Sequence, residues 1–111
     1  MTMEQFAQRL SSILQAANTT ERDLSLRLGH NPGYINAICT QKSFPSMELF
    51  FDICDELNIT PLDFFEEQNT NPSKINELLP YLNAINPKEF DNISSIIKAL
   101  ADKEKTNDSE K

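Results

Sequence analysis

The sequence predicts an all-α fold, and three observations support this prediction. Apolar residues recur at intervals of three and four along most of the chain, which is the spacing of one helix face. Runs of β-branched residues, which favour strands, are short and few. The chain has two glycines against six prolines, which indicates helices joined by short connections. Its 111 residues, 39% of them hydrophobic, suffice for one modest core with a small appended element.

Capping residues mark the first two helices. The first follows Thr2, which forms a capping-box pattern with Gln5, and it ends at Asn18, a residue that tolerates the left-handed conformation. The second follows Thr20, whose hydroxyl can accept a free helical N–H, and it ends at Gly29. The residues expected on the buried faces of these helices are Phe6, Leu10, Ile13, Ala17, Leu24 and Leu28.

Three more helices are expected before residue 67. The third is capped by Asn31, because this residue directly precedes Pro32 and proline is favoured at the first helical position. Ser46 caps a fourth helix that ends at Asn58, and Thr60 starts a short fifth helix. The apolar residues that these helices carry are Tyr34, Ile35 and Ile38 in the third, Met47, Phe50, Ile53, Cys54 and Leu57 facing inward in the fourth, and Leu62, Phe64 and Phe65 in the fifth.

Two further helices follow the polar segment "EEQNTNPSK". Asn71 with Pro72 predicts the start of a sixth helix, in which Pro80 removes one amide hydrogen bond and introduces a kink. Asn86 with Pro87 starts a last helix. The sequence therefore predicts three parts: a five-helix domain over residues 1–67, a helical hairpin over 68–101, and a disordered tail over 102–111 that has no apolar residue.

The C-terminal hairpin is predicted to be a dimerisation element. A hairpin of two helices is too small, and too apolar on one side, to be stable alone. It must pack on the first domain or on a second copy of itself, and we favour the second copy. The apolar stripe expected to form the homodimer is Phe90, Ile93, Ile97 and Leu100.

Several short motifs between Phe6 and Phe65 occur in a recognisable order. A capped helix ends in Leu28-Gly29, Tyr34-Ile35 lies in the next helix, and Pro45-Ser46 precedes an amphipathic helix. A Pro-x-x-Phe-Phe run closes the segment. In this order and spacing, the segment resembles the lambda-repressor-like, Xre/Cro-type helix-turn-helix family.

The resemblance implies a five-helix domain whose third helix enters the major groove of double-stranded DNA, while the helix after Thr20 contacts phosphate. Glu21 stands where the family usually has a glutamine, and Pro32 and Gly33 have no polar side chain with which to read bases. The candidate DNA-binding residues are Arg22, Asn31, Asn36, Thr40, Lys42 and Ser43.

The charge of the chain is acidic overall but unevenly distributed. The chain has 17 acidic and 10 basic residues, a formal net charge of −7, which opposes DNA binding by bulk attraction. The segment 20–44 has three basic and two acidic residues, whereas the segment 48–67 has seven acidic and no basic residues. The acidic charge therefore lies mainly outside the candidate DNA-binding segment.

The sequence offers no catalytic residues, no metal site and no cofactor motif, so we expect no enzyme. His30 is the single histidine, and no nucleophile or second imidazole is spaced to join it. Cys39 and Cys54 each lie in an apolar stripe, which is typical of buried thiols in a reducing compartment. Neither a signal-peptide pattern nor a run of eighteen apolar residues is present, so we expect a cytoplasmic protein without membrane contact.

These observations favour a dimeric, sequence-specific, double-stranded DNA-binding transcriptional regulator that acts as a repressor. The alternative is a protein-interaction module, in which the acidic surface of the same scaffold binds a basic partner and DNA binding is weak or absent.

Overall fold

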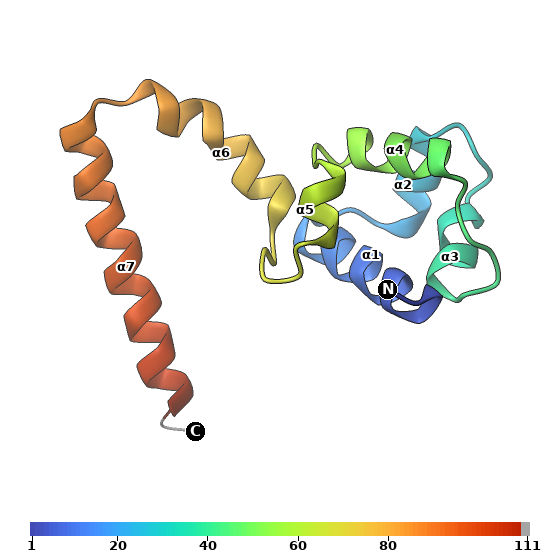
Figure 1. Cartoon of the computed structure of the whole chain (residues 1–111), viewed down its shortest axis with the longest axis horizontal. Helices are drawn as coiled ribbons and strands as arrows, with labels where there is room; N and C mark the ends of the chain where they lie inside the picture. Colours follow the sequence, from blue (N-terminus) through green and yellow to red (C-terminus); the bar gives the residue numbers. More distant parts are fainter. Residues whose placement is uncertain (110–111) are drawn as a thin grey trace. The chain divides into compact units, whose positions relative to one another are not determined.

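A computed structural model describes residues 1–109, with side chains described up to residue 105. All regular structure in this part of the chain is helical, which confirms the all-α prediction (Figure 1). The chain divides into two compact units, Met1–Glu77 and Leu78–Lys111. The helices are α1 Met3–Ala16, α2 Glu21–Arg27, α3 Tyr34–Cys39, α4 Met47–Glu56, α5 Pro61–Phe65, α6 Pro72–Ala84 and α7 Pro87–Ser109.

Local hydrogen bonds explain where most helices of the first unit begin and end. Four hydroxyl groups accept the N–H of the residue three positions later, namely those of Thr2 (3.1 Å), Thr20 (3.0 Å), Ser46 (3.1 Å) and Thr60 (3.0 Å). Asn18 (φ 54°) and Asn58 (φ 56°) adopt the left-handed conformation after α1 and α4, as does Gly29 (φ 79°) after α2. The predicted starts of α1, α2, α4 and α5 are confirmed.

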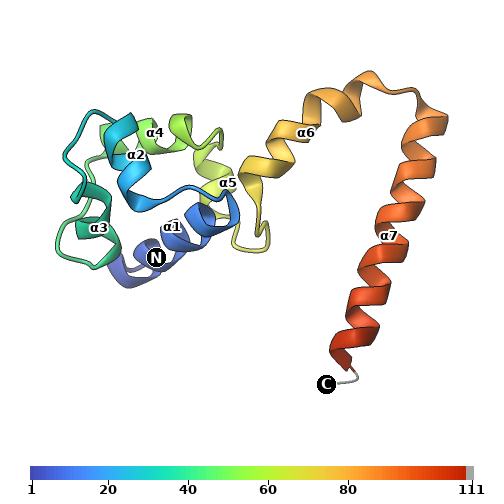
Figure 2. The ribbon, with the colours of Figure 1, turned by 180° about the vertical axis from the view of Figure 1, so that it is seen from behind.

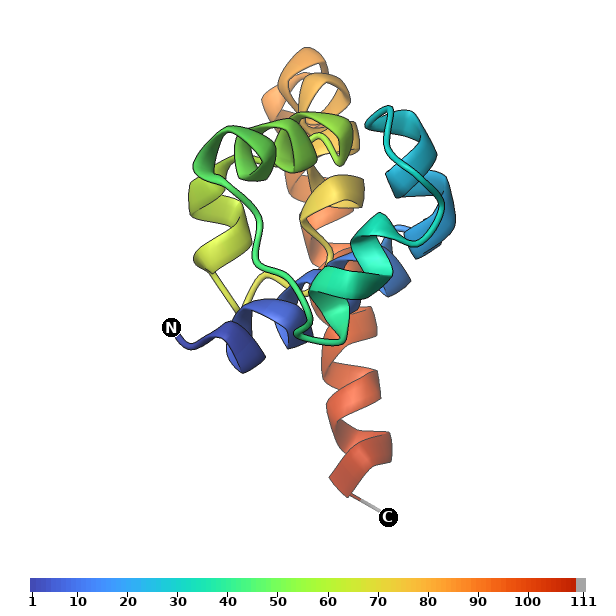
Figure 3. The same cartoon turned by 90° about the vertical axis from the view of Figure 1, so that its right-hand side faces the viewer.

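The five helices of the first unit share one core. In Figure 3 they surround a common interior. The rings of Phe6, Phe50 and Phe64 pack at its centre, with centroids 4.8 Å apart for Phe6 and Phe64 and 5.1 Å apart for Phe50 and Phe64. The remaining core residues are Leu10, Ile13, Leu14, Leu24, Ile35, Ile38, Leu49, Ile53, Cys54, Leu57 and Ile59. Leu28 is half-buried and packs against this core.

The helices α2 and α3 lie at one end of the first unit, and α5 lies at the other, as seen from both sides in Figures 1 and 2. The candidate DNA-binding surface and the end of the unit that leads into α6 are therefore separate parts of the molecule.

The third helix starts later than the sequence predicted. The Oδ1 atom of Asn31 accepts the N–H of Gly33 (3.0 Å), and the N–H of Tyr34 donates to the Asn31 carbonyl three residues back (3.1 Å). Residues 31–33 therefore form a tight turn before α3, and Asn31 caps this turn rather than the helix. The helix ends at Cys39 because Gln41, with φ of 65°, turns the chain away.

Met47 does not face inward, and this prediction is wrong. Its side chain is 66% exposed, whereas Leu49 and Phe50 of the same first turn of α4 are buried. Met47 lies at the edge of the core, where it lines a hollow in the surface rather than filling the interior.

The start of α6 belongs to the first unit, so the boundary lies inside α6 and not at residue 67. Ser73 Oγ donates to the Leu57 carbonyl at 2.7 Å. Asn76 Nδ2 donates to the Asn58 carbonyl and to Asp63 Oδ2, both at 2.9 Å. The Thr60 N–H and then the Asn76 amide hold the pKa of Asp63 below its usual range, because they stabilise the carboxylate.

In the second unit, α7 starts as predicted. Asn86 Oδ1 accepts the Glu89 N–H at 2.8 Å, and Asn86 Nδ2 donates to Glu89 Oε1 at 2.7 Å. The chain remains helical through Pro80 up to Ala84. No side chain from residue 78 to residue 105 is buried, so α6 and α7 form no buried core within a single copy of this part of the chain. The portion of α6 in this unit is too short to cover the 23 residues of α7.

The predicted disordered tail is wrong for residues 102–109, since α7 continues to Ser109. The segment contains Lys103, Glu104 and Lys105, whose helix propensity is high, so the absence of apolar residues does not end the helix. Residues 110 and 111 of that prediction lie outside the described residues.

Candidate nucleic-acid interface

One buried hydroxyl group joins α2 to α3. Ser25 is fully buried, donates to the Glu21 carbonyl (2.7 Å) and accepts the N–H of Ile35 (3.0 Å). The N-cap residue of α3 is Gly33, which has no side chain to accept a helical N–H, so Ser25 satisfies one of these donors from the neighbouring helix. The role of Ser25 was not predicted from the sequence. The only indication there was a small polar residue next to Leu24 on an apolar helix face.

The turn between the two helices is fixed by several contacts. The His30 N–H donates to the Ser25 carbonyl at 3.0 Å. The His30 ring stacks on Tyr34, with centroids 4.1 Å apart and an interplanar angle of 13°. Tyr34 is half-buried and packs against the core. The backbone of α3 is thus held in place at its start by α2, by the turn and by the core.

The structure places the predicted DNA-binding residues on α2, on α3 and on the segments that flank α3. Arg22, Asn31, Asn36, Thr40 and Lys42 are exposed, and Ser43 is half-buried. Thr40 Oγ1 donates to the Asn36 carbonyl at 2.8 Å, so this hydroxyl caps its own helix and retains only acceptor capacity. Asn31 Oδ1 accepts the Gly33 N–H, which leaves the two N–H donors of its amide and one lone pair of Oδ1 available.

The side chain of Asn36 is oriented by Glu21. Asn36 Nδ2 donates to Glu21 Oε2 at 2.8 Å. This bond uses one of the two N–H donors of the amide, and it leaves the second donor and the Oδ1 acceptor free. One donor and one acceptor in this arrangement match the major-groove edge of adenine, which offers N7 and the N6 amino group. Glu21, which stands where the resembled family usually has a glutamine, therefore orients the Asn36 side chain.

Few positive charges are available beside these groups. Arg27 lies in an ion pair with Glu56 (Nε to Oε2, 3.1 Å) and also donates to the Glu56 carbonyl at 2.7 Å. Within the part of the chain that the structure describes, Arg22 and Lys42 have no ion-pair partner. Arg22 and Lys42 are therefore the two cations of this candidate surface without an ion-pair partner among the described residues, and Glu21 adds a negative charge to α2.

The two cysteines are unreactive groups in this fold. Burial, and to a smaller extent Glu21, raises the pKa of the Cys39 thiol. Burial, with smaller contributions from Asp55 and Asp63, raises the pKa of Cys54 to about 11. Both side chains therefore remain protonated at neutral pH, and a thiol in that state is a poor nucleophile and a poor metal ligand. Among the residues that were described, no cluster of three or more His, Cys, Asp or Glu side chains could hold a metal ion.

A second candidate surface lies on α7. The predicted dimerisation residues are all exposed, namely Phe90, Ile93, Ile97 and Leu100. They are spaced by three and four residues and so lie along one side of the helix. Ile96 is exposed beside this stripe, 60% of its side chain being accessible, and sequence reasoning did not include it.

In comparisons with known proteins, no family model, no curated protein and no solved structure matches this chain. None of the described helices combines the length and the apolar character that a bilayer-crossing segment requires.

Proposed function

We propose that this chain is a dimeric, sequence-specific, double-stranded DNA-binding transcriptional regulator in which α3 reads bases in the major groove. The observation that carries the proposal is the exposed Asn36 amide, which Glu21 holds with one donor and one acceptor free. Ser25 supports it by fixing the backbone of α3 against α2. The resemblance of residues 6–65 to the Xre/Cro-type helix-turn-helix family supports the same reading of these helices.

The other polar groups of the surface divide into two roles under this proposal. Arg22 and Lys42 contact phosphates, which position the protein without reading sequence. Thr40, with its remaining acceptor capacity, and Ser43 contact bases or the backbone near the end of α3. The Asn31 amide lies on the turn before α3, where it can donate to a phosphate oxygen.

Dimerisation through α7 would place two copies of α3 on one DNA duplex. Two recognition helices in a twofold dimer engage successive major grooves when they are roughly 34 Å apart, one turn of the duplex. A dimer bound over a promoter blocks access of the transcription machinery, so we propose repression. Two free cysteines are typical of proteins in the reducing cytoplasm, where we propose that this protein acts.

A protein-interaction module is the second candidate, and the observation that favours it is the charge. The net charge is −7, and one of the few basic side chains near α3, Arg27, is occupied by Glu56. If that candidate is correct, no duplex sequence will be preferred at any salt concentration.

Asn36→Ala is expected to relax specificity at one base pair in each half-site. Loss of a bidentate contact costs on the order of 1–3 kcal/mol in discrimination against the wrong base. The measurement is a titration of the preferred duplex, and of duplexes altered at each position, with both proteins. Lys42→Ala is the matched control, because a lost phosphate contact weakens all sequences alike and leaves the preference unchanged. An unaltered base preference in Asn36→Ala would contradict the assignment of Asn36.

Glu21→Gln is expected to tighten DNA binding. Glutamine keeps an oxygen that can accept the Asn36 N–H, while it removes one negative charge near the phosphates. We expect roughly fivefold higher affinity at low salt, with the gain decreasing as salt increases. Glu21→Ala removes the charge and the acceptor together, so it should gain affinity but lose part of the preference at the Asn36 base pair. Equal base preferences in the two variants would show that Glu21 does not position Asn36.

A further inference from the structure

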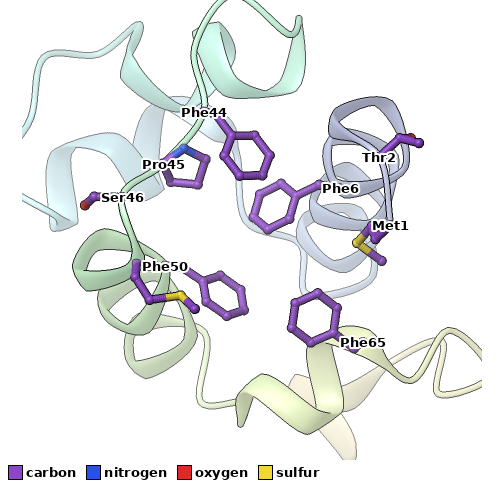
Figure 4. Close-up of a pocket in the computed structure, with 9 residues that line it drawn as sticks. Met1, Thr2, Phe6, Phe44, Pro45, Ser46, Phe50 and Phe65 are labelled. Atoms are coloured by element: carbon purple, nitrogen blue, oxygen red, sulfur yellow. The ribbon is translucent and has the colours of Figure 1, made fainter.

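The first unit has an apolar hollow that the DNA-binding surface does not use. The hollow has a volume of about 260 Å³ and lies between the start of α1, the connection from α3 to α4, α4 and α5. Figure 4 shows the rings of Phe6, Phe44, Phe50 and Phe65 arranged around it. The Phe6 centroid lies 5.1 Å from that of Phe44, and the Phe50 centroid lies 5.6 Å from that of Phe65.

The hollow has a buried floor and an exposed rim. Phe6 and Phe50 belong to the core, whereas Phe44, Phe65 and Met47 are all at least half exposed. Large apolar side chains grouped at the surface in this way mark an interaction site more often than scattered ones do. The shape is a socket that one large apolar side chain can enter.

The socket offers few groups that would orient a polar ligand, namely the O–H donors of two hydroxyl groups in its wall. The two hydroxyl groups in its wall, Thr2 and Ser46, already accept the N–H groups of Gln5 and Leu49 as helix caps. The remaining lining consists of aromatic rings, methionines and a proline. Its occupant must therefore be apolar where it enters.

The surroundings of the socket are acidic. Along the outer face of α4, Met47 and Phe51 form one exposed row, and Glu48 lies beside Met47 at the start of the adjacent row. Asp52 and Asp55 continue this row towards the end of α4, where they lie beside Arg27. Within the described residues, neither Glu48 nor Asp52 lies in an ion pair. Phe65 is followed directly by Glu66 and Glu67, and the whole segment 48–67 has no basic residue.

We propose that this face binds a basic, amphipathic segment of a partner protein, with an apolar side chain in the socket and flanking Lys or Arg residues on the acids of α4. Charge complementarity selects this occupant. Nucleic acid and anionic membrane are both repelled by the acidic rim. A second copy is a poor match, because the chain has a net charge of −7 and the apolar part of α7, residues 87–101, has equal numbers of acidic and basic residues. The proposal does not depend on DNA binding by α3.

The test is selection of a random peptide display library on the immobilised full-length chain, followed by titration of the most enriched peptide as a labelled synthetic probe. We expect enriched sequences in which Lys or Arg flanks an aromatic or aliphatic residue. Met47→Glu places a charge at the mouth of the socket and should weaken the probe roughly tenfold or more. Leu62→Glu is the matched control, since Leu62 is 78% exposed and does not line the socket, and it should change the affinity by less than about twofold.

Glu48→Lys tests the charge separately from the socket, because it leaves the lining unchanged. It should weaken the same probe, and the effect should shrink as salt increases. The proposal is overturned if no peptide is enriched, or if Met47→Glu and Leu62→Glu weaken the probe equally. Enriched peptides without basic residues would point to a pocket for a small apolar molecule and would also overturn it. A lower oligomeric state of the full chain in Met47→Glu would assign the face to a second copy instead.

Discussion

Ile97→Glu is expected to convert the full-length chain from a dimer to a monomer at micromolar concentration. Ile97 lies in the middle of the exposed stripe on α7 and is 57% exposed. Burial of a side chain of this size stabilises an interface by about 1.5–3 kcal/mol, and each copy contributes four in the proposed stripe. A carboxylate buried there without a partner would cost more than any one of these contacts supplies.

The same variant should bind the selected duplex roughly a hundredfold more weakly, because the second half-site is then no longer engaged within one molecule. Analytical sedimentation measures the solution mass of each variant, and titration measures its affinity for the selected duplex. Ser95→Glu is the matched control, since Ser95 is exposed on α7 but lies off the stripe, so the dimer should persist. A wild-type chain that sediments as a monomer, or an Ile97→Glu variant that remains dimeric, would show that α7 does not form the interface.

Arg9→Met is expected to lower the free energy of unfolding by about 3 kcal/mol. The Arg9 side chain is only 6% exposed, and it donates to the carbonyls of Phe64 (2.6 Å), Asp63 (2.8 Å), Glu66 (2.8 Å) and Asn69 (3.0 Å). Methionine has a similar length but no donor, so these carbonyls at the end of α5 lose their partner. The result would be a looser connection between the core and the segment that leads into α6.

Urea unfolding followed by circular dichroism measures this loss. Gln8→Met is the control, because Gln8 is the exposed neighbour of Arg9 on the same helix. Arg9→Lys should lie between Arg9→Met and wild type, since an ammonium group keeps the charge but cannot reach all four carbonyls in the geometry of a guanidinium. Equal unfolding midpoints for Arg9→Met and Gln8→Met would contradict the role assigned to Arg9.

The parts of the fold that were predicted correctly depend on short-range chemistry. Thr2 with Gln5, Thr20, Ser46 and Thr60 cap helices through bonds to residues three positions away, and such pairs are visible in a sequence. The left-handed positions at the ends of the helices follow from residue type in the same way. Periodicity then placed most core residues, because the face of a helix that is apolar is the face that is buried.

The parts that were not predicted depend on contacts between distant residues. Arg9 bonds to carbonyls more than fifty positions away, and nothing near residue 9 indicates this. Ser73 and Asn76 attach the start of α6 to the first unit, so the turn-rich segment before Pro72 was mistaken for a boundary. The spacing of Met47 along α4 predicts an inward side chain. Met47 nevertheless lies at the edge of the core, because its position depends on how the other helices pack, which spacing alone does not show.

The structure gives the exposure of the candidate site residues, and the arrangement of these residues could not be predicted from the sequence. Asn36, Thr40 and Lys42 are exposed as expected, whereas the hydrogen bond from Asn36 to Glu21 required the packing of α3 on α2 through Ser25. That arrangement gives Glu21 a role in orienting Asn36, whereas the sequence showed only that Glu21 stands where the resembled family usually has a glutamine.

The most direct test of DNA reading by α3 is selection of duplexes from a random pool by the full-length wild-type protein at low salt. We expect one sequence to be enriched, with twofold symmetry, half-sites one helical turn apart and an adenine contact in each half-site. If no duplex is enriched above background, α3 does not read DNA and the central claim is wrong.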